Sequence, residues 1–354
     1  MFQYRGAFQP PSEPRTTMIK VGVIGFGYWG PNLVRNFATS DRCKMVAVAD
    51  LDSKRLAAAE RSYPGIRTTT NPADLFAAAD IDAVAISTPV QYHFDLALAA
   101  LQAGKHVLVE KPMAASAADC RRLIDEAAKR KLTLMVDHTF IYTPAVQKMR
   151  DLVQTGELGE IYYYDSVRVN LGLFQHDVNV LWDLAVHDLS IIEYVLGKVP
   201  VAVSATGISH VPGAPENIAY LTMFFEDSTI AHVNVNWLAP VKVRQTLISG
   251  SKKMVVFNEL EPSEKIKVYD KGIVLNDDQE QINKLIAGYR TGDMWAPQLA
   301  GTEALAAEVR HFADCIETGT APLTDGEMGY NVVKVLEAAS KSLAQRGASV
   351  AVER

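Results

Sequence analysis

The sequence predicts an α/β protein of two parts: a doubly wound parallel-sheet domain, and then an α+β domain with a large open, mainly antiparallel sheet. Three observations support this. Short β-branched runs alternate with helical patterns as far as residue 140, a glycine-rich turn follows the first run, and longer alternating strands follow Pro144. The length of 354 residues suits two domains at a prior of about 150 residues each.

The first domain is predicted from five apolar runs and the helices between them. The strands are residues 19–24, 45–49, 83–87, 107–109 and 133–136, and the helices are residues 30–39, 53–62, 72–78, 92–103 and 117–130. Strands that are apolar on both faces and separated by crossover helices belong to a parallel sheet covered on both sides. We assign residues 18–141 to this domain and interpret residues 1–17, which contain three prolines, as a flexible leader.

The second domain, residues 142–354, is predicted from consecutive strands joined by short turns. These strands are residues 161–170, 201–209, 218–225, 229–236, 243–249, 253–257 and 265–270. One helix, residues 181–196, interrupts them, residues 288–297 form a polar loop, and closing helices lie within residues 303–346. The pattern favours an antiparallel meander. We expect this domain to bind the substrate and to form the contacts between subunits.

Composition excludes several classes of protein. The net charge of −6 arises from 35 basic and 41 acidic residues without long runs, so no basic stripe for nucleic acid exists. No apolar stretch reaches the roughly 18 residues that a membrane helix needs. The cysteines, Cys43, Cys120 and Cys315, are too far apart for a zinc site or a disulfide framework. We therefore expect a cytoplasmic protein with no metal.

The strongest motif is Gly25-Phe26-Gly27-Tyr28-Trp29-Gly30, a GxGxxG turn between an apolar strand and a helix. Such a turn lets main-chain N–H groups approach a pyrophosphate at a helix N-terminus, as in the Rossmann fold. Asp50 ends the next strand, where a carboxylate accepts hydrogen bonds from a ribose 2′-OH. Because Asp50 and Asp52 would repel a 2′-phosphate, NAD is favoured over NADP.

Two further elements suggest acid–base chemistry. Lys111 follows a buried strand at the edge where open α/β sheets bind ligands, although its position alone favours a surface lysine paired with Glu110. Asp183 and His187 are four positions apart on an apolar helix and are expected to share a face, which suits a general base. A buried structural pair and two ligands of a metal are the alternatives, and the metal lacks a third ligand.

Together these stretches resemble the glucose–fructose oxidoreductase/inositol dehydrogenase/rhizopine-catabolism family of NAD(P)-dependent oxidoreductases. The similarity runs from Met18 to about Gln345. The matching stretches are residues 25–30, Ser87-Thr88-Pro89 with His93, Glu110-Lys111-Pro112, Trp182-Asp183 through His187, and Glu308-Val309-Arg310-His311-Phe312 with residues 322–326.

The resemblance implies roles for matching positions. Lys111 and His187 would be the acid–base groups, and Asp183 would orient or contact substrate hydroxyls. Four further residues would lie along the cofactor: Ser87, Thr88, His93 and Glu110. One departure is that many members carry an Asn-Arg-Arg-Phe-type segment where this chain has His138-Thr139-Phe140-Ile141, so the substrate cannot be copied from sugar-oxidising relatives.

These observations predict an NAD-dependent oxidoreductase that moves hydride between nicotinamide and a secondary alcohol of a sugar, polyol or nucleotide-activated sugar. Arg168 and Asn170 share a strand face and could bind the substrate, although a polar outer face explains them equally. Residues 171–179 and the loop with Arg290 and Trp295 favour a nucleotide sugar. The alternatives are a non-catalytic NAD-binding sensor and an oxidoreductase whose tightly bound cofactor is recycled in place.

The open sheet also predicts assembly. Tyr220, Thr222 and Phe224 alternate with Leu221, Met223 and Phe225, so both faces of that strand are apolar. One face is expected to pack on helices and the other on a second subunit, which gives a homodimer or homotetramer.

Overall fold

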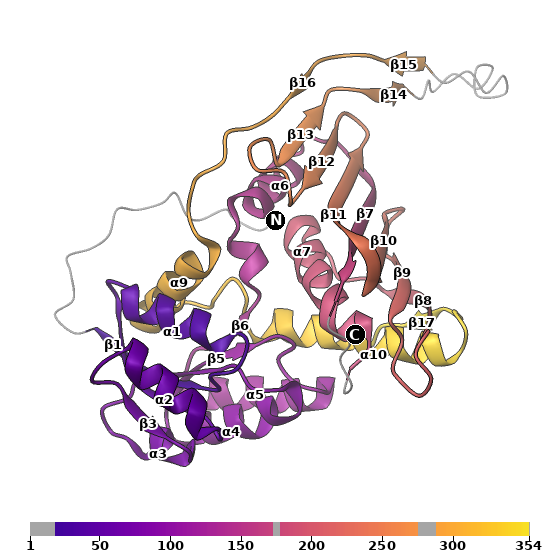
Figure 1. The fold of residues 1–354 in the computed structure, drawn as a ribbon. Coiled ribbons are helices and arrows are strands. Elements are labelled where there is room, and N and C mark those ends of the chain that lie inside the picture. The colour runs from indigo at the N-terminus through magenta and orange to yellow at the C-terminus, as the bar shows by residue number, and fades with distance from the viewer. Residues whose placement is uncertain (1–17, 173–177, 275–287, 354) are drawn as a thin grey trace.

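The structure, a computed structural model, describes residues 18–172, 178–274 and 288–353, with the backbone alone over residues 272–274 and 288–290. The predicted leader, residues 1–17, lies outside the described residues. Figure 1 shows two sheets in separate halves of the molecule, with the long yellow helix α10 (Gly326–Ala344) running from one half to the other. The two-sheet fold class predicted from the sequence is confirmed.

The first half is a six-stranded parallel sheet in the order β3-β2-β1-β4-β5-β6. Its strands are β1 (Ile19–Ile24), β2 (Cys43–Ala49), β3 (Arg67–Thr69), β4 (Ala83–Ile86), β5 (His106–Glu110) and β6 (Leu134–Asp137). The order reverses between β1 and β4, and ligands of doubly wound sheets bind at the carboxyl ends of the strands at this point.

Helices cover both faces of this sheet. They are α1 (Gly30–Thr39), α2 (Ser53–Ser62), α3 (Ala73–Ala77), α4 (His93–Gln102) and α5 (Ala117–Arg130), and a short 3₁₀ turn, η1 (Val90–Tyr92), leads into α4. All four residues of β4 are buried, which explains why its sequence is a continuous apolar run rather than an alternation. The edge strand β3 is short and largely polar, so no apolar pattern predicted it.

The second half contains a nine-stranded sheet in the order β16-β13-β12-β11-β7-β10-β9-β8-β17. Its strands are β7 (Ile161–Leu171), β8 (Ala202–Ile208), β9 (Ile218–Phe224), β10 (Ile230–Asn236), β11 (Leu238–Gly250), β12 (Met254–Asn258), β13 (Ile266–Tyr269), β16 (Met294–Trp295) and β17 (Val350–Ala351). Neighbours pair antiparallel except β10 and β7, which are parallel. The sheet is therefore mainly antiparallel, as predicted, but is not a simple meander.

Two short strands lie in the predicted polar loop of residues 288–297. They are β15 (Gly288–Arg290), which pairs with β14 (Gly272–Val274), and β16, which extends the edge of the large sheet. Two-residue and three-residue strands carry too few residues for an alternation to show, so the sequence pattern could not separate them from a loop.

One face of the large sheet is covered by helices. They are α6 (Pro144–Gln154), α7 (Val186–Leu196) and α10, and a π-helical turn, η3 (Leu181–Ala185), precedes α7. Helix α10 also contacts α5 of the first half. Helix α9 (Ala304–Thr318) packs against α1 and the 3₁₀ turn η2 (Thr139–Tyr142).

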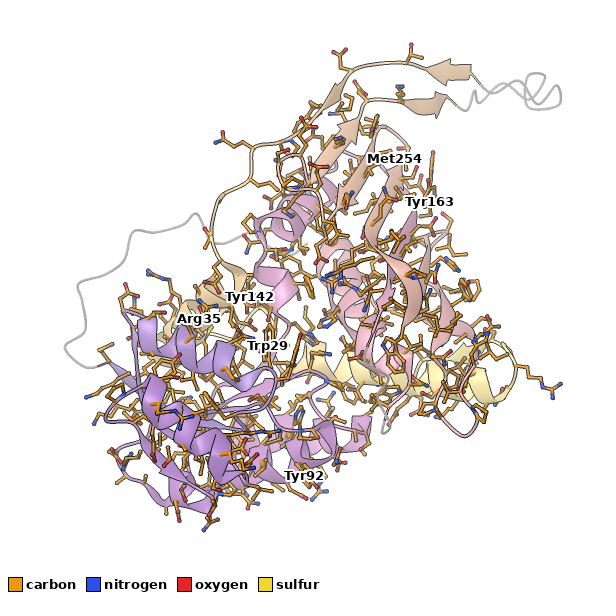
Figure 2. The ribbon with its side chains drawn as sticks, in the orientation of Figure 1. Trp29, Arg35, Tyr92, Tyr142, Tyr163 and Met254 are labelled. Carbon is orange, nitrogen blue, oxygen red and sulfur yellow. The ribbon has the colours of Figure 1, made fainter. Side chains whose placement is uncertain are left out.

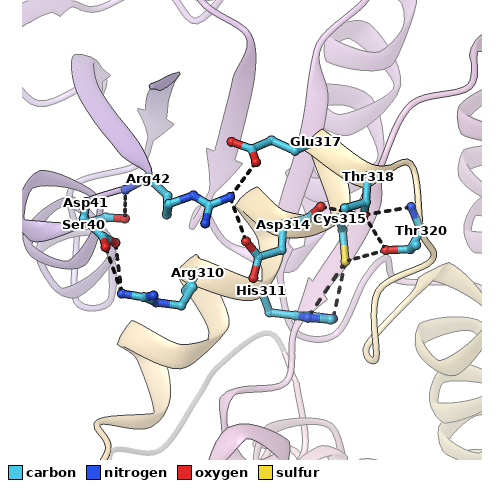
Figure 3. A network of polar contacts seen from close by, with 10 residues as sticks. All are labelled: Ser40, Asp41, Arg42, Arg310, His311, Asp314, Cys315, Glu317, Thr318 and Thr320. Atoms are coloured by element: carbon cyan, nitrogen blue, oxygen red, sulfur yellow. Dashed lines mark hydrogen bonds and ion pairs between the residues drawn. The ribbon is translucent and has the colours of Figure 1, made fainter. Parts of the chain in front are cut away.

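Ion pairs fix α9 to the loop before β2 (Figure 3). Arg42 contacts Asp314 at 3.1 Å and Glu317 at 2.5 Å, and Arg310 contacts Asp41 at 3.0 Å. The closing helices therefore join the two halves. Within the described part of the chain, no helix has both the length and the hydropathy needed to cross a membrane.

Candidate active site

The glycine-rich turn has the geometry that its sequence predicts. Gly25 has φ of +96°, and a Cβ atom there would lie 2.7 Å from the main-chain oxygen of Ser87. A Cβ atom on Gly30 would lie 2.1 Å from the oxygen of Gly25, so only glycine lets α1 begin this close to β1. Gly27 is less crowded, since a Cβ atom there would meet only Arg55, with Nη1 at 3.5 Å.

This turn forms one wall of a cavity of about 760 Å³, within the range of about 300–1,000 Å³ for ligand pockets. The cavity extends from Asp50, past the turn, to Lys111 and Asp183. Ten predicted cofactor residues line it: Gly25, Gly27, Tyr28, Trp29, Asp50, Ser87, Thr88, His93, Glu110 and Lys111. The glycine-rich turn and the Asp50 carboxylate at one end of the cavity therefore fit a dinucleotide.

Phe26 and Gly30, also predicted to contact the cofactor, have structural roles instead of lining this cavity. The Phe26 ring belongs to the hydrophobic core, and its N–H donates to Asp50 Oδ2 at 2.6 Å. Gly30 is the first residue of α1. Both residues shape the turn from behind.

Asp50 is held in place by main-chain donors. In addition to the Phe26 N–H, the N–H of Asp52 donates to Asp50 Oδ1 at 2.8 Å. Arg55, on the first turn of α2, lies 3.6 Å from Asp50 Oδ2 and also lines the cavity. Sequence analysis missed Arg55, although its position in the helix directly after Asp50 was a usable signal.

Lys111 and Asp183 meet at the other end of the cavity. Lys111 Nζ donates to the main-chain oxygen of Asp183 at 3.0 Å and lies 3.8 Å from Asp183 Oδ1. Trp237 Nε1 donates to Asp183 Oδ2 at 3.0 Å. The carboxylate is therefore shared between a cation from the first half and an indole from the second.

His187 lies beside this pair, but the cavity lining does not include it. Its ring packs edge-on against Phe140 with the centroids 4.9 Å apart, and its Nδ1 atom is buried without a hydrogen-bond partner. Burial and then the charge of Lys111 lower the pKa of His187 well below its usual value of 6.5. The imidazole is therefore neutral near pH 7 and has a free lone pair.

The predicted pairing of Asp183 with His187 is not found among the hydrogen bonds of the described residues. Asp183 lies in the π-helical turn η3, and His187 lies in the first turn of α7. The rule that residues four apart share a face assumes an α-helix, and a π turn has a wider spacing. Asp183 consequently points to Lys111 and Trp237.

Two predicted residues hold the loop that carries Lys111. The ring nitrogens of His93 lie 2.9 Å from the Pro112 oxygen and 2.7 Å from the Thr88 oxygen, which ties this loop to the end of β4. Glu110 accepts a hydrogen bond from the Lys111 N–H. Burial, and then the charge of Asp137, raise the pKa of Glu110 to about 8.

The predicted substrate residues lie on the helix-covered face of the large sheet. Arg168 is 4% exposed, and its Nε donates to Asp188 Oδ2 at 2.8 Å. Its Nη1 contacts Glu259 at 3.4 Å. The Asn170 Oδ1 atom is buried and unpartnered. The guanidinium of Arg168 is thus engaged in a buried ion pair, whereas Asn170 keeps a free acceptor.

Three residues that sequence analysis did not assign to the site surround His187. Arg244 on β11 lies opposite Arg168 on β7 in the strand register. Both guanidinium groups lie over the Phe140 ring, with that of Arg244 6.0 Å and that of Arg168 4.7 Å from the ring centroid. Both ring nitrogens of His138 are buried without a partner, and burial lowers the pKa of His138 to about 3. The sequence difference from the family's Asn-Arg-Arg-Phe-type segment at residues 138–141 could have pointed to His138 and Phe140 as site residues.

Comparisons with known proteins match both halves of the chain. Residues 19–138 match the model described as "Oxidoreductase family, NAD-binding Rossmann fold". Residues 146–256 match the GFO/IDH/MocA C-terminal domain. The chain belongs to the GFO/IDH/MocA family of oxidoreductases. The predicted family is confirmed, and this chain is therefore an oxidoreductase with an NAD-binding Rossmann domain.

Characterised members of the GFO/IDH/MocA family are similar over nearly the whole chain. The UDP-N-acetylglucosamine 3-dehydrogenase of Acidithiobacillus ferrooxidans is 29% identical over 323 residues, which cover 89% of this chain and 94% of that protein. Its solved structure superposes with a TM-score of 0.78 and covers 93% of this chain and 99% of that one. The inositol 2-dehydrogenase of Rhizobium meliloti is 27% identical over 341 residues, 93% and 98% of the two chains.

A third protein, known from its solved structure, supports the fold alone. A levoglucosan dehydrogenase, solved in complex with NADH and levoglucosan, superposes with a TM-score of 0.81 at 21% identity. The superposition covers 96% of this chain and 100% of that one.

Proposed function

We propose that this protein is an NAD-dependent dehydrogenase of a secondary alcohol in a sugar or polyol, with a nucleotide-activated sugar as the first candidate substrate. One observation carries the proposal. A cavity that begins at the Asp50 carboxylate ends at the Lys111–Asp183 pair, so a dinucleotide bound through its ribose would place its far end beside a lysine.

The residues around that end can move a proton. Bound NAD supplies the hydride acceptor. The Lys111 ammonium, held by Asp183, donates a hydrogen bond to the substrate oxygen and stabilises negative charge that develops there. The neutral His187 ring, whose Nδ1 atom has no hydrogen-bond partner, is the candidate to take the hydroxyl proton. Asp183, fixed by Trp237, keeps the Lys111 side chain at the cavity wall.

Buried polar atoms without a hydrogen-bond partner favour a substrate with several hydroxyl groups. These atoms are Asn170 Oδ1, Arg244 Nε and both ring nitrogens of His138. A buried polar group without a partner costs free energy, so such groups mark places where a ligand supplies the missing hydrogen bond. The relatives act on substrates of this kind by name: UDP-N-acetylglucosamine and inositol.

NAD is preferred over NADP in this proposal. Asp50 is positioned to accept hydrogen bonds from the ribose hydroxyls and would repel a 2′-phosphate. Arg55 opposes this preference, because a guanidinium 3.6 Å from Asp50 can pair with a phosphate. Asp50 has the stronger influence, because two main-chain donors fix it, whereas the Arg55 side chain is 52% exposed.

The uncovered face of the large sheet supports assembly into a homodimer or homotetramer. Leu221 and Met223 are fully buried against the helices, while Tyr220 and Phe224 on the same strand are 44% and 38% exposed. Ile230, opposite Phe224 on β10, is 41% exposed. An apolar face of this kind is typical of a contact between subunits.

The test is an assay of NADH formation at neutral pH. Purified protein is incubated with NAD and, in turn, UDP-N-acetylglucosamine, other UDP-sugars, free sugars and inositols, and Lys111→Ala serves as the negative control. Turnover with one class identifies the substrate. Binding of NAD with no turnover on any substrate would instead indicate a sensor. Cofactor that stays bound through purification and cycles between two substrates would indicate recycling in place.

A further inference from the structure

The carboxyl group of Glu308 lies in the interior of the protein without a donor. Glu308 is on α9 and is 0% exposed, and its apolar neighbours on the helix include Leu305, Val309 and Phe312, which are also buried. Both carboxyl oxygens are buried without a hydrogen-bond partner in the part of the chain that the structure describes. An ionised carboxylate in such a place is strongly destabilising, so the group requires either a cation or a proton.

The neighbour of Glu308 is a second acid, Asp137. The Asp137 side chain lies close enough to Glu308 that its charge and its side-chain hydrogen bonding raise the pKa of Glu308, and Asp137 is 2% exposed at the end of β6. Asp137 Oδ2 accepts from Trp29 Nε1 at 2.7 Å, and Asp137 Oδ1 accepts from the Thr139 hydroxyl. Both oxygens of Asp137 therefore already have a donor. The Thr139 hydroxyl also lies near Glu308, but it has one proton and donates it to Asp137.

Two buried carboxyl groups in contact cannot both be ionised. Because Asp137 has donors and Glu308 has none, the shared proton belongs on Glu308, whose O–H then donates to Asp137. The other groups near Glu308 do not supply a cation, because they are an acid and a phenol. Glu110 lies opposite Asp137 in the register of β5 and β6, and Tyr142 lies on η2. Burial and the charge of Asp137 raise the pKa of Glu308 well above its usual range.

The chain of contacts from Glu308 ends at the dinucleotide cavity. Trp29 belongs to the glycine-rich turn and lines that cavity. Figure 2 labels Trp29 at the place where the two halves meet. The ion pairs of Figure 3 fix α9, and with it Glu308, to the same parallel-sheet half.

We propose that Glu308 is a positioning residue: a neutral carboxylic acid that donates to Asp137 and, through Asp137, fixes the Trp29 indole at the wall of the cofactor cavity. This inference rests on the proposed dinucleotide site. It also assigns a role to the Glu308-Val309-Arg310-His311-Phe312 stretch, far from the glycine-rich turn in sequence.

The experiment compares three variants of the full-length protein. Glu308→Gln keeps a neutral donor of nearly the same shape, Glu308→Leu removes the donor, and Trp29→Phe removes the indole N–H. Cys315→Ala, another buried position on α9, is the control for general loosening of the helix. The dissociation constant for NAD is measured by calorimetry, thermal unfolding is followed without cofactor, and the infrared band of protonated carboxylic acids is recorded.

The expected result is a split between the two Glu308 variants. Glu308→Leu raises the Kd for NAD about tenfold, on the order of one charge-assisted hydrogen bond, whereas Glu308→Gln restores it to within about twofold. In the Trp29→Phe background, Glu308→Leu has less than about a twofold effect, because the two residues act through one contact. The infrared band weakens in Glu308→Gln. Cys315→Ala lowers the melting temperature, because it truncates a buried side chain, but it changes neither the Kd for NAD nor the infrared band.

Several results would overturn the inference. An unchanged infrared band in Glu308→Gln would show that the group is ionised, and this measurement decides even if the leucine variant does not fold. Equal loss of affinity in both Glu308 variants would show that the charge, not the donor, matters. Additive effects of Glu308→Leu and Trp29→Phe would break the link to Trp29. If the parent does not bind NAD, the link to the cofactor and the proposed function fail together, while the infrared band still reports on the proton.

Discussion

Lys111 and Asp183 stand 72 positions apart in the chain, yet Lys111 Nζ donates to the Asp183 main-chain oxygen at 3.0 Å. One residue follows a strand of the parallel sheet, and the other lies in the turn before α7 of the second half. The contact therefore forms only when the two halves are assembled, which makes the proposed acid–base site a property of the whole chain.

Loss of either proposed acid–base group should reduce turnover and spare cofactor binding. Lys111→Ala and His187→Ala are each expected to lower kcat by about 10² to 10⁴, the usual cost of losing acid–base assistance. The Kd for NAD should change by less than about threefold, because neither residue belongs to the phosphate or ribose site. Steady-state kinetics and calorimetry measure both quantities, with the exposed Lys129→Ala as the matched control. Unchanged turnover in both variants would show that neither Lys111 nor His187 is the acid–base group.

Asp183→Asn should keep the fold and impair turnover. The amide oxygen can still accept from Trp237 Nε1, but the negative charge beside Lys111 is lost. We expect kcat to fall at least about tenfold while the melting temperature stays within a few degrees. Trp237→Phe is the companion variant, since it removes the donor and leaves the charge. A kcat equal to that of the parent in Asp183→Asn would show that the Lys111 side chain needs no anion.

The sequence predicted residues that act within one local element better than residues that meet across elements. Gly25, Gly30 and Asp50 could be assigned because a strand, a tight turn and a helix start leave a local pattern. The partners of Asp183 could not, because Trp237 lies on a segment between two strands and the π-helical turn has no sequence signature. The expected Asp183–His187 pair failed for that reason.

The same distinction holds for the large sheet. Alternation located the strands β7 and β9 closely, but it did not reveal that β7 lies between β11 and β10. Pairing of β10 with β7 is parallel and needs the long connection through α7, and strand order of this kind depends on which faces pack together. Arg168 is buried because β7 lies inside the sheet, so its burial could not be predicted from the sequence either.

The pH dependence of the rate should reflect the environment of His187. Its pKa is lowered by burial and by Lys111, so the ring stays neutral, and able to accept a proton, to below pH 6.5. As pH falls further the ring is protonated and the rate is lost. The acid limb of kcat/KM should therefore lie below 6.5 in the parent, measured from about pH 5 to 9. A limb at or above 6.5 that His187→Ala leaves in place would contradict the assignment.

The preference for NAD over NADP should depend on two side chains of opposite charge, Asp50 and Arg55. NAD is expected to bind at least about tenfold tighter than NADP, a difference of about 1.4 kcal/mol. Asp50→Ser should narrow that gap, because it removes the charge that repels a 2′-phosphate. Arg55→Ala should widen it, because it removes the nearby cation. Calorimetric titration of the parent and the two variants with both cofactors measures the dissociation constants, and equal affinity of the parent for NAD and NADP would contradict the role of Asp50.

Assembly should depend on the uncovered face of the sheet. Phe224 and Ile230 are directly opposite each other on β9 and β10 and are both exposed. The double variant Phe224→Asp, Ile230→Asp places like charges on each surface that would meet its copy, so we expect dissociation to monomers at micromolar concentration. Light scattering measures the mass, and Leu323→Asp, an exposed leucine before α10, is the matched control. Because Leu221 and Met223 face the helices, the double variant should keep the parent's circular dichroism spectrum. A parent that is already monomeric would leave this apolar face to another kind of partner and would contradict the proposed self-association.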